Sequence, residues 1–352
     1  MNTVKKDTFT TMQKNTVDLP DDYDALYGHF HKVKMGVERE SSDYVEYRKL
    51  WKKAAVEHIV TKFPLHLDIE ITSHCNLLCT MCPRTHRVER GDWVSEHMSF
   101  ERFCSIIDEG VDNGLCAINL NNFGESFMNK DIYRMIGYAK NRGVLEVMLH
   151  TNGTIMSEKI ASRTIESGLD KIIFSVDSVE KETYESIRVG ARFEKVINNV
   201  RTFSRVRRKF GSVTPEIRIS MVLMNENAHQ LEDFKRYWGD DVDTITYVDY
   251  RNQDGLDNED RYLKKRKENR AYACPSLWQR MTINSSGQVT ACCRDAGKRL
   301  EIGNLDTSES LLSIWKGTTL SKARKLHQKG EGWKLDACNG CDHIRGWQPS
   351  DD

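Results

Sequence analysis

Three cysteines lie close together in the segment SHCNLLCTMCPR, residues 73–84. Cys75, Cys79 and Cys82 follow the spacing C-x3-C-x2-C. Structural zinc sites and fully ligated iron–sulfur clusters usually take four protein ligands. This motif supplies only three, so the fourth ligand must be identified. If the chain supplies none, the metal keeps an open position to which a substrate or cofactor can bind.

A helix face and a zinc site are the two alternatives for these cysteines. The three positions share one face of a helix, where buried cysteine is common. The rest of that face is not apolar, however, and Pro83 would interrupt a helix. Zinc would need His74 or His86 as a fourth ligand, but His74 is adjacent to Cys75 and no second C-x2-C pair lies nearby. We therefore favour an iron–sulfur cluster with an open iron.

A second set of cysteines lies in the last eighty residues. Twelve residues separate Cys274 from Gly287, and four more residues lead on to Cys292. Cys338 and Cys341 follow in the motif CNGC. Two pairs of thiolates suit zinc as well as an iron–sulfur cluster, so a zinc ribbon remains an alternative for this set.

The overall composition excludes several classes of function. The chain of 352 residues has 52 basic and 52 acidic side chains, and this balance argues against nucleic acid or an anionic membrane as a partner. No apolar run approaches the roughly 20 residues that span a bilayer. The polar N-terminus lacks the apolar core of a secretory signal, so we expect a cytoplasmic protein. Its ten cysteines are then thiols or metal ligands.

Short β-like runs alternate with amphipathic stretches over residues 64–255. Ser99 is placed to cap a helix over 99–109, and a second helical period covers 131–142. Alternation of this kind predicts parallel strands joined by helical crossovers. The predicted strands are LHLDIEI (65–71), CAINLN (116–121), LEVMLH (145–150), KIIFSVD (171–177), EIRISMVLM (216–224) and TITYVDY (244–250).

Polar residues near the C-terminal ends of the strands favour a barrel over an open sheet. Strands covered by helices on both faces are usually continuous apolar runs, whereas alternating polar residues indicate a wet or ligand-bearing lumen. We therefore predict an α/β fold, a partial (βα)6 TIM-like barrel with a small C-terminal cysteine-rich domain. The predicted division is a partly helical extension (1–63), the barrel (64–255), and a charged linker with the cysteine-rich domain (256–352). The polar strand-end residues are Asp68, Glu70, Asn119, Asn121, Ser175 and Asp177.

The first cysteine motif, on the loop after the first predicted strand, resembles the signature of the radical S-adenosylmethionine (SAM) enzymes. The resemblance implies a [4Fe–4S] cluster held by Cys75, Cys79 and Cys82, with the amino and carboxylate groups of SAM on the fourth iron. It also implies reductive cleavage of SAM to a 5′-deoxyadenosyl radical that abstracts hydrogen from a substrate.

Further positions extend the resemblance and imply contacts to SAM. In NNFGES, Gly124 and Glu125 match a GGEP-like segment, while Phe123 and Ser126 depart from it. Met81 stands where an aromatic residue often touches adenine, and a thioether can also pack on a ring. The other implied contacts come from HTNG, FSVDS and YESIRVG, and are Asn152, Ser175, Asp177 and Arg188.

The C-terminal cysteines resemble the opening of a SPASM domain, in its shorter Twitch form. The resemblance implies an auxiliary [4Fe–4S] cluster held by Cys274, Cys292, Cys338 and Cys341. The glycine spacing favours Cys292 over Cys293, which would lie beside the cluster or donate a hydrogen atom. The two remaining cysteines are expected in the core, and are Cys104 and Cys116.

From this resemblance we expect a radical SAM oxidoreductase that dehydrogenates or epimerises a sugar or an aminocyclitol-like small molecule. The auxiliary cluster would accept an electron from the substrate radical, and a flavodoxin or ferredoxin would supply the reducing electron. A peptide-modifying enzyme is the main alternative, and a non-catalytic metal-binding protein is the second.

Overall fold

The computed structural model describes residues 29–32, 41–250, 273–307, 309–339 and 341. The predicted charged linker at 251–270 and most of the predicted extension before residue 41 lie outside the described residues. Within this part of the chain, no helix combines the length and apolar character needed to cross a membrane.

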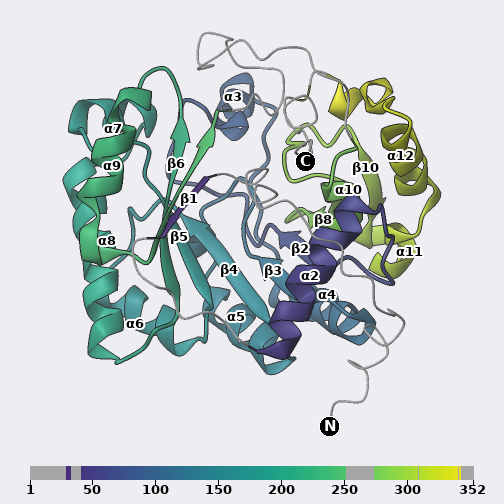
Figure 1. The fold of residues 1–352 in the computed structure, drawn as a ribbon, viewed down its shortest axis with the longest axis horizontal. Helices are drawn as coiled ribbons and strands as arrows, with labels where there is room; N and C mark the ends of the chain where they lie inside the picture. Colours follow the sequence, from purple (N-terminus) through teal and green to yellow (C-terminus); the bar gives the residue numbers. More distant parts are fainter. Residues whose placement is uncertain (1–28, 33–40, 251–272, 308, 340, 342–352) are drawn as a thin grey trace.

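The described strands form one mixed sheet of ten, in the order β1-β7-β6-β5-β4-β3-β2-β8-β9-β10 (Figure 1). From β2 to β7 each neighbouring pair is parallel, as the alternation of strands and helices predicts. The strands are β1 (His29–Lys32), β2 (His66–Ile69), β3 (Ala117–Asn119), β4 (Glu146–Thr151), β5 (Lys171–Ser175), β6 (Glu216–Leu223), β7 (Thr244–Asp249), β8 (Arg280–Ile283), β9 (Gln288–Thr290) and β10 (Glu301–Asn304).

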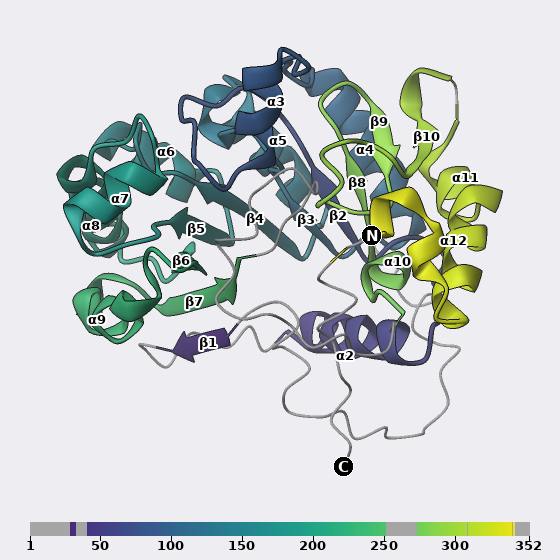
Figure 2. The same ribbon diagram turned by 90° about the horizontal axis from the view of Figure 1, so that it is seen from above.

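Helices that follow the strands cover the convex face of the curved sheet, whereas α2 lies on the concave side (Figure 2). The predicted helices over 99–109 and 131–142 correspond to α4 and α5, and the side chain of Ser99 caps α4. The helices are α2 (Ser42–Val56), α3 (Pro83–Arg90), α4 (Phe100–Asn113), α5 (Ile132–Asn141), α6 (Glu158–Glu166), α7 (Lys181–Ile187), α8 (Phe193–Lys209), α9 (Leu231–Tyr237), α10 (Ser276–Gln279), α11 (Leu311–Trp315) and α12 (Thr318–Gln328).

The sheet is a partial barrel because its two ends pair with other strands and not with each other. On one side, β7 pairs with the antiparallel strand β1. On the other side, β2 pairs in parallel with β8, which belongs to the cysteine-rich C-terminal part. The predicted fold is therefore confirmed, and the C-terminal part also extends the same sheet.

Strand β2 shows why the polar residues alternate. Leu67 and Ile69 join the buried core beneath the outer helices, together with Phe103 of α4. His66 and Asp68 point the other way, where the ring of Trp51 from α2 packs edge-on against His66 at 5.7 Å. The concave face is thus polar and α2 covers part of it.

Helix α2 is fixed by apolar packing and by hydrogen bonds. Five of its side chains lie in a buried cluster that also contains Cys116. Tyr44 donates to Glu146 of β4 at 3.2 Å, and Gln279 of α10 donates to the carbonyl oxygen of Trp51 at 2.8 Å. Cys116 is buried as expected, whereas Cys104 is only half-buried, because the side of α4 that carries it lies at the edge of the packed face. The expectation of a core position for Cys104 was wrong.

Trp51→Ala should lower the free energy of unfolding by about 3–5 kcal/mol, because the side chain is 3% exposed and its removal leaves a cavity. Urea unfolding of the cluster-free protein measures the loss. Val45→Ala on the same helix is the control, since Val45 is 40% exposed and its truncation should change stability by less than about 0.5 kcal/mol. An equal effect of both substitutions would contradict the packing role of α2.

Candidate active site

Cys75, Cys79 and Cys82 lie on the loop that joins β2 to α3, at the C-terminal end of the first parallel strand. The loop is not helical, and Cys82 is the N-cap residue of α3. Pro83 is the first residue of that helix, where its missing N–H costs nothing. The cysteines therefore precede a helix and do not share one of its faces.

Arg84 fixes the backbone of the cysteine loop, although the sequence analysis did not single it out. Its guanidinium donates to the carbonyl oxygens of Ser73 at 3.3 Å, Leu77 at 3.2 Å and Cys75 at 3.3 Å. The side chain is buried, and a guanidinium presents its donors in a fixed fork. Three loop carbonyls are thereby held in one arrangement. The only sequence signal was its place two residues after Cys82.

A neighbouring segment after α7 pairs with the outer part of the loop. The backbone N–H of Leu78 donates to Val189 at 3.0 Å, and that of Thr80 donates to Ile187 at 3.0 Å. Arg188 lies between these residues, with its Nη1 3.9 Å from the sulfur of Cys79. The predicted site residue Arg188 is thus brought against one of the predicted ligands.

Arg188 forms a buried ion pair with Asp177, another predicted site residue. Its Nε donates to Oδ2 of Asp177 at 2.6 Å, and Oδ1 of Asp177 accepts from the backbone N–H of Val222 at 2.8 Å. Burial alone would lower the pKa of Arg188, but the charges of Asp177 and Cys79 outweigh it and raise the pKa above its ordinary value. The guanidinium is therefore a permanent positive charge beside Cys79.

The three thiols are close enough to change one another's pKa values. Burial is the main cause that raises the pKa of Cys79 to about 12; the charge of Arg188 opposes the rise, and the thiolates of Cys82 and Cys75 contribute to it. Burial also raises the pKa values of Cys75 and Cys82. Thiols kept protonated in this way release protons when a metal binds, which is usual for thiolate sites.

Gly124 is required because the NNFGES segment passes directly against the cysteine loop. A β-carbon at this position would lie 1.9 Å from the carbonyl oxygen of Thr72. The next residue, Glu125, donates its backbone N–H to His74 at 2.8 Å, directly before the first cysteine. The glycine match in this motif therefore has a steric cause.

The carboxylate of Glu125 supports the HTNG segment. It accepts from the hydroxyl of Thr151 at 2.8 Å and from the backbone N–H of Asn152 at 2.7 Å. Burial raises its pKa. Lone pairs remain on the two oxygens, so the expected contact to a SAM amino group stays a prediction.

Asn152 reaches the cysteine loop. Its amide nitrogen donates to Asn76 at 2.9 Å and lies 3.9 Å from the sulfur of Cys75. Ser175 is half-buried at the end of β5, in register with Ser220 of β6. Met81 is half-buried and packs against two buried apolar clusters. The contacts of these residues to SAM likewise stay predictions.

His150 is a second residue that the sequence analysis passed over, although it begins the HTNG motif. Its side chain is half-buried at the end of β4, and burial together with the charge of Arg218 lowers its pKa to about 4. The imidazole is therefore neutral at physiological pH and can donate or accept a hydrogen bond.

The four C-terminal cysteines also come together. Burial, with a smaller contribution from the thiolate of Cys341, raises the pKa of Cys274 to about 11. Burial also raises the pKa of Cys338, and the thiolates of Cys274 and Cys341 contribute to that rise. The pKa of Cys292 is raised by a hydrogen bond with Cys293, by burial and by the same two thiolates. Gly287, with φ +92°, turns the chain between β8 and β9 and so brings Cys292 back toward Cys274.

Cys293 faces a different neighbourhood from the other C-terminal cysteines. Its thiol is hydrogen-bonded to Cys292, and it also lies near Asp68, Arg280 and Arg294. The hydrogen bond to Cys292 lowers its pKa. The choice of Cys292 as the cluster ligand stays a prediction.

Each cysteine set brings together the number of thiols that a cluster needs. The first set has three thiols and the second has four, and the members of each set lie near enough to influence one another's pKa. Each thiolate of a [4Fe–4S] cluster ligates a different iron, so three thiols fit a cluster with an open iron and four fit a closed cluster.

The sequence model of the Radical SAM superfamily matches residues 69–237, and that of the SPASM iron–sulfur cluster-binding domain matches residues 274–342. The chain belongs to the radical SAM superfamily. Members of this superfamily are enzymes, and the two domains bring a SAM-binding [4Fe–4S] cluster and an auxiliary iron–sulfur cluster.

Two curated relatives match about half of the chain. The tungsten-containing aldehyde ferredoxin oxidoreductase cofactor-modifying protein of Pyrococcus furiosus is 30% identical over 178 residues, 49% of this chain and 47% of the relative. A probable GTP 3′,8-cyclase of Methanococcus maripaludis is 27% identical over 169 residues, 48% of this chain and 53% of the relative. The chain thus spans only about half the length of these relatives.

Solved structures match over more of the chain but at low identity. BtrN in complex with AdoMet and 2-DOIA has a TM-score of 0.55 and 17% identity, covering 84% of this chain and 99% of BtrN. SuiB of Streptococcus suis, bound to its precursor peptide SuiA, has a TM-score of 0.61 and 15% identity, covering 89% and 77%. At this level of identity, the likeness concerns the fold.

Gly124→Ala should prevent iron loading at the first cysteine set, because the added methyl group displaces the Thr72–His74 backbone that leads into the cysteines. Iron content after anaerobic reconstitution should fall by about half, and SAM cleavage should be lost.

Gly137→Ala in α5 is the matched control. A β-carbon there would lie 4.0 Å from its nearest neighbour, so iron content and SAM cleavage should be unchanged. Normal iron loading in Gly124→Ala would show that the contact with Thr72 is not needed.

Proposed function

We propose that the protein is an oxidoreductase that removes hydrogen from a hydroxyl-bearing small molecule without a triphosphate group, such as a sugar or aminocyclitol, by dehydrogenation or epimerisation. When bound, the first cluster with SAM supplies hydrogen-atom abstraction, and the auxiliary cluster supplies an acceptor for the second electron. The proposal includes the division into an extension (1–63), a barrel (64–255) and a linker with the auxiliary domain (256–352).

The charge balance of the concave face carries the substrate proposal. Lys171 contacts Glu146 at 3.0 Å and Glu216 at 3.5 Å, and Arg218 contacts Glu216 at 3.1 Å. Arg280 contacts Asp68 at 3.2 Å, so three cations and three carboxylates compensate one another.

A balanced polar lumen favours a polar substrate that does not carry several negative charges. A triphosphate would need several cations that are not already engaged by carboxylates. On the concave face of the described residues, each cation of the set above has a carboxylate partner. This observation disfavours a nucleoside triphosphate, although a GTP 3′,8-cyclase is among the relatives.

Peptide modification is the second candidate, because SuiB bound to a precursor peptide shares the fold. The full coverage of BtrN, at 99% of its length, supports the small-molecule proposal instead. The two candidates differ in what couples to SAM cleavage, and this difference can be measured.

The chain's own residues have two proposed tasks around the cofactors. Cys75, Cys79 and Cys82 would hold the first cluster, and Gly124, Glu125, Asn152, Ser175, Asp177, Arg188 and Met81 would surround SAM. Arg188 and Asp177 would act as a positioning pair at Cys79. The auxiliary cluster would be held by Cys274, Cys292, Cys338 and Cys341.

Anaerobic reconstitution followed by SAM cleavage assays tests the proposal. We expect about eight irons per chain. Nucleotide sugars, free aminosugars, aminocyclitols and peptides are then supplied in turn. One 5′-deoxyadenosine per ketone product would indicate dehydrogenation, and deuterium uptake from solvent without oxidation would indicate epimerisation. Cleavage coupled only to a peptide would refute the small-molecule proposal.

Cysteine variants separate the roles of the two clusters. Cys338→Ala should retain about four irons and SAM cleavage but lose the oxidised product, whereas Cys82→Ala should lose SAM cleavage. Cys104→Ala is the control, because this half-buried thiol on α4 belongs to neither set. Zinc in place of auxiliary iron would contradict the electron-acceptor role.

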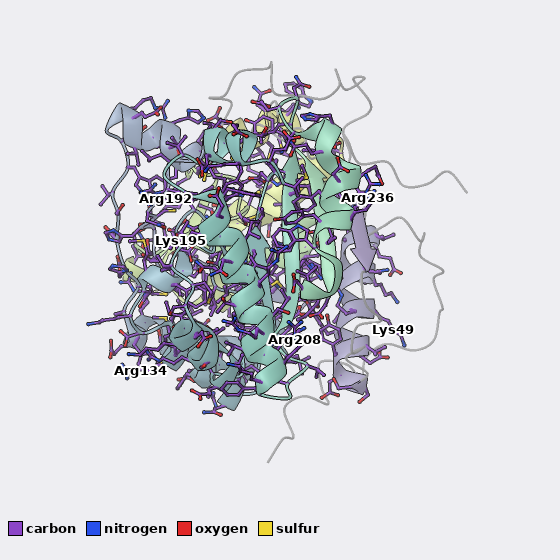
Figure 3. The ribbon with its side chains drawn as sticks, turned by 90° about the vertical axis from the view of Figure 1, so that its left-hand side faces the viewer. Lys49, Arg134, Arg192, Lys195, Arg208 and Arg236 are labelled. Carbon is purple, nitrogen blue, oxygen red and sulfur yellow. The ribbon has the colours of Figure 1, made fainter. Side chains whose placement is uncertain are left out.

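We propose that an acidic electron donor of the flavodoxin or ferredoxin kind docks on the outer side of the cysteine loop. Leu78 and Val189 form an exposed apolar pair there, at 40% and 42% exposure. Arg192 and Lys195 are exposed at the adjacent end of α8 (Figure 3). Apolar contacts rimmed by basic charge suit a transient complex with an acidic protein.

Lys195→Glu should lower the rate of flavodoxin-supported turnover by about tenfold at low ionic strength, through slower association. Turnover supported by dithionite should not change. Arg208→Glu is the control, because Arg208 lies toward the other end of α8 (Figure 3). Equal loss with both reductants would mean that the substitution damages the enzyme and does not affect docking.

A further inference from the structure

A cavity of about 390 Å³ lies away from the cysteine loop, between the segment after α2 and the helices of the C-terminal part. One wall is formed by His58 and Lys62, which precede β2. The other wall is formed by Trp278 of α10, by Lys316 directly after α11 and by residues of α12. The cavity therefore joins a segment before the barrel to the auxiliary domain.

The lining of this cavity is strongly basic. Lys62, Lys316, Arg324 and Lys325 contribute to it, and no aspartate or glutamate does. The described residues provide no carboxylate within ion-pair distance of these four cations. In a second cavity of the described residues the one lining cation, Arg102, pairs with Asp306 at 2.5 Å, whereas here four cations lie together without a carboxylate.

Arg324 gives the strongest indication of a ligand. It is 4% exposed, its Nε donates to Leu277 at 2.9 Å, and its Nη1 donates to Trp315 at 3.0 Å. Its Nη2 is buried and has no hydrogen-bond partner among the described residues. Burial lowers the pKa of Arg324 to about 10, so the side chain is charged at neutral pH. The guanidinium also lies over the ring of Trp315 at 4.2 Å, but no carboxylate of the described residues compensates its charge, and buried charges are normally paired with an opposite one.

The apolar wall suits the organic part of a ligand. The ring of His58 stacks on Trp278 at 4.4 Å, with 27° between the planes. His58 has φ +55° because it ends α2 in a left-handed turn, in which the backbone N–H of Ile59 donates to the carbonyl oxygen of Ala54 at 2.9 Å. This turn places the imidazole ring beside the indole, at the edge of the cavity.

We propose that this cavity binds the phosphate group of a small phosphorylated molecule, whose organic part lies against Trp278 and His58. Arg324 and the three lysines would compensate the phosphate charge, since guanidinium and ammonium groups are the usual phosphate partners in proteins. A ligand at this position contacts both the segment before β2 and helix α12. The site is independent of the proposed reaction, because none of its residues lies at the cysteine loop or on the concave face.

Isothermal titration of the reconstituted enzyme, with SAM present to occupy the cofactor site, tests this proposal. The probes are inorganic phosphate, pyrophosphate and AMP, with citrate as a carboxylate anion. We expect one site per chain for pyrophosphate and AMP. Lys316→Gln and Lys325→Gln should each weaken binding by about fivefold, and Lys325→Glu should abolish it.

Lys322→Gln is the matched control, because Lys322 is exposed on the same helix but does not line the cavity. It should leave the affinity unchanged. Arg324→Gln should also abolish binding, and the exposed lysine variants keep the test valid if that buried substitution impairs folding. SAM cleavage in the lysine variants should match the parent enzyme.

Three results would overturn the proposal. Failure of all phosphate probes to bind would remove the site. Binding that is equally strong in Lys316→Gln, Lys325→Gln and Lys322→Gln would place the anion elsewhere. Citrate binding without phosphate binding would show that the cavity is not specific for phosphate.

Discussion

The fork of hydrogen bonds from Arg84 to the carbonyls of the cysteine loop is the interaction on which the first site depends. Without it, the carbonyl oxygens of Leu77 and Cys75 would lose this donor, and that of Ser73 would keep only a long hydrogen bond from the indole of Trp93 at 3.4 Å. The guanidinium satisfies all three from one rigid group. The cysteine side chains can then point away from the clamp, toward the residues that end the neighbouring strands.

The second constraint is the first parallel strand itself, because both cysteine sets are arranged around it. Strand β2 leads directly into the first set. Asp68, near its end, pairs with Arg280 of β8, and Glu70 accepts from the backbone and side chain of Ser285 in the turn before β9. Burial raises the pKa of Glu70, and hydrogen bonds from Ser285 and Phe123 oppose that rise. Two cysteine groups far apart in sequence are therefore anchored to one strand.

Local patterns predicted the elements and the cysteine groups. The six parallel strands, the cap at Ser99 and the loop position of the cysteines all follow from spacing and periodicity, which act over a few residues. The partners of the polar strand ends could not be predicted in this way. Asp68 pairs with a residue 212 positions away and Glu70 with one 215 positions away, so only the folded sheet brings them together. The same holds for Glu125, whose carboxylate supports Thr151 and Asn152 because β3 and β4 are neighbours. Arg84 and His150 were missed because an arginine after a cysteine motif and a histidine at a strand end have many ordinary uses.

The pairing of β8 with β2 has a consequence for the evolution and engineering of the protein. A barrel that ended at β2 would present the open edge of that strand to solvent, and exposed edges invite intermolecular strand pairing and aggregation. Here the cysteine-rich part covers that edge with four residues in parallel register. It therefore protects the strand that carries the first metal site from association with other chains, in addition to any role in electron transfer. Exchanging this part between related enzymes would succeed only if the incoming strand kept the register of β8.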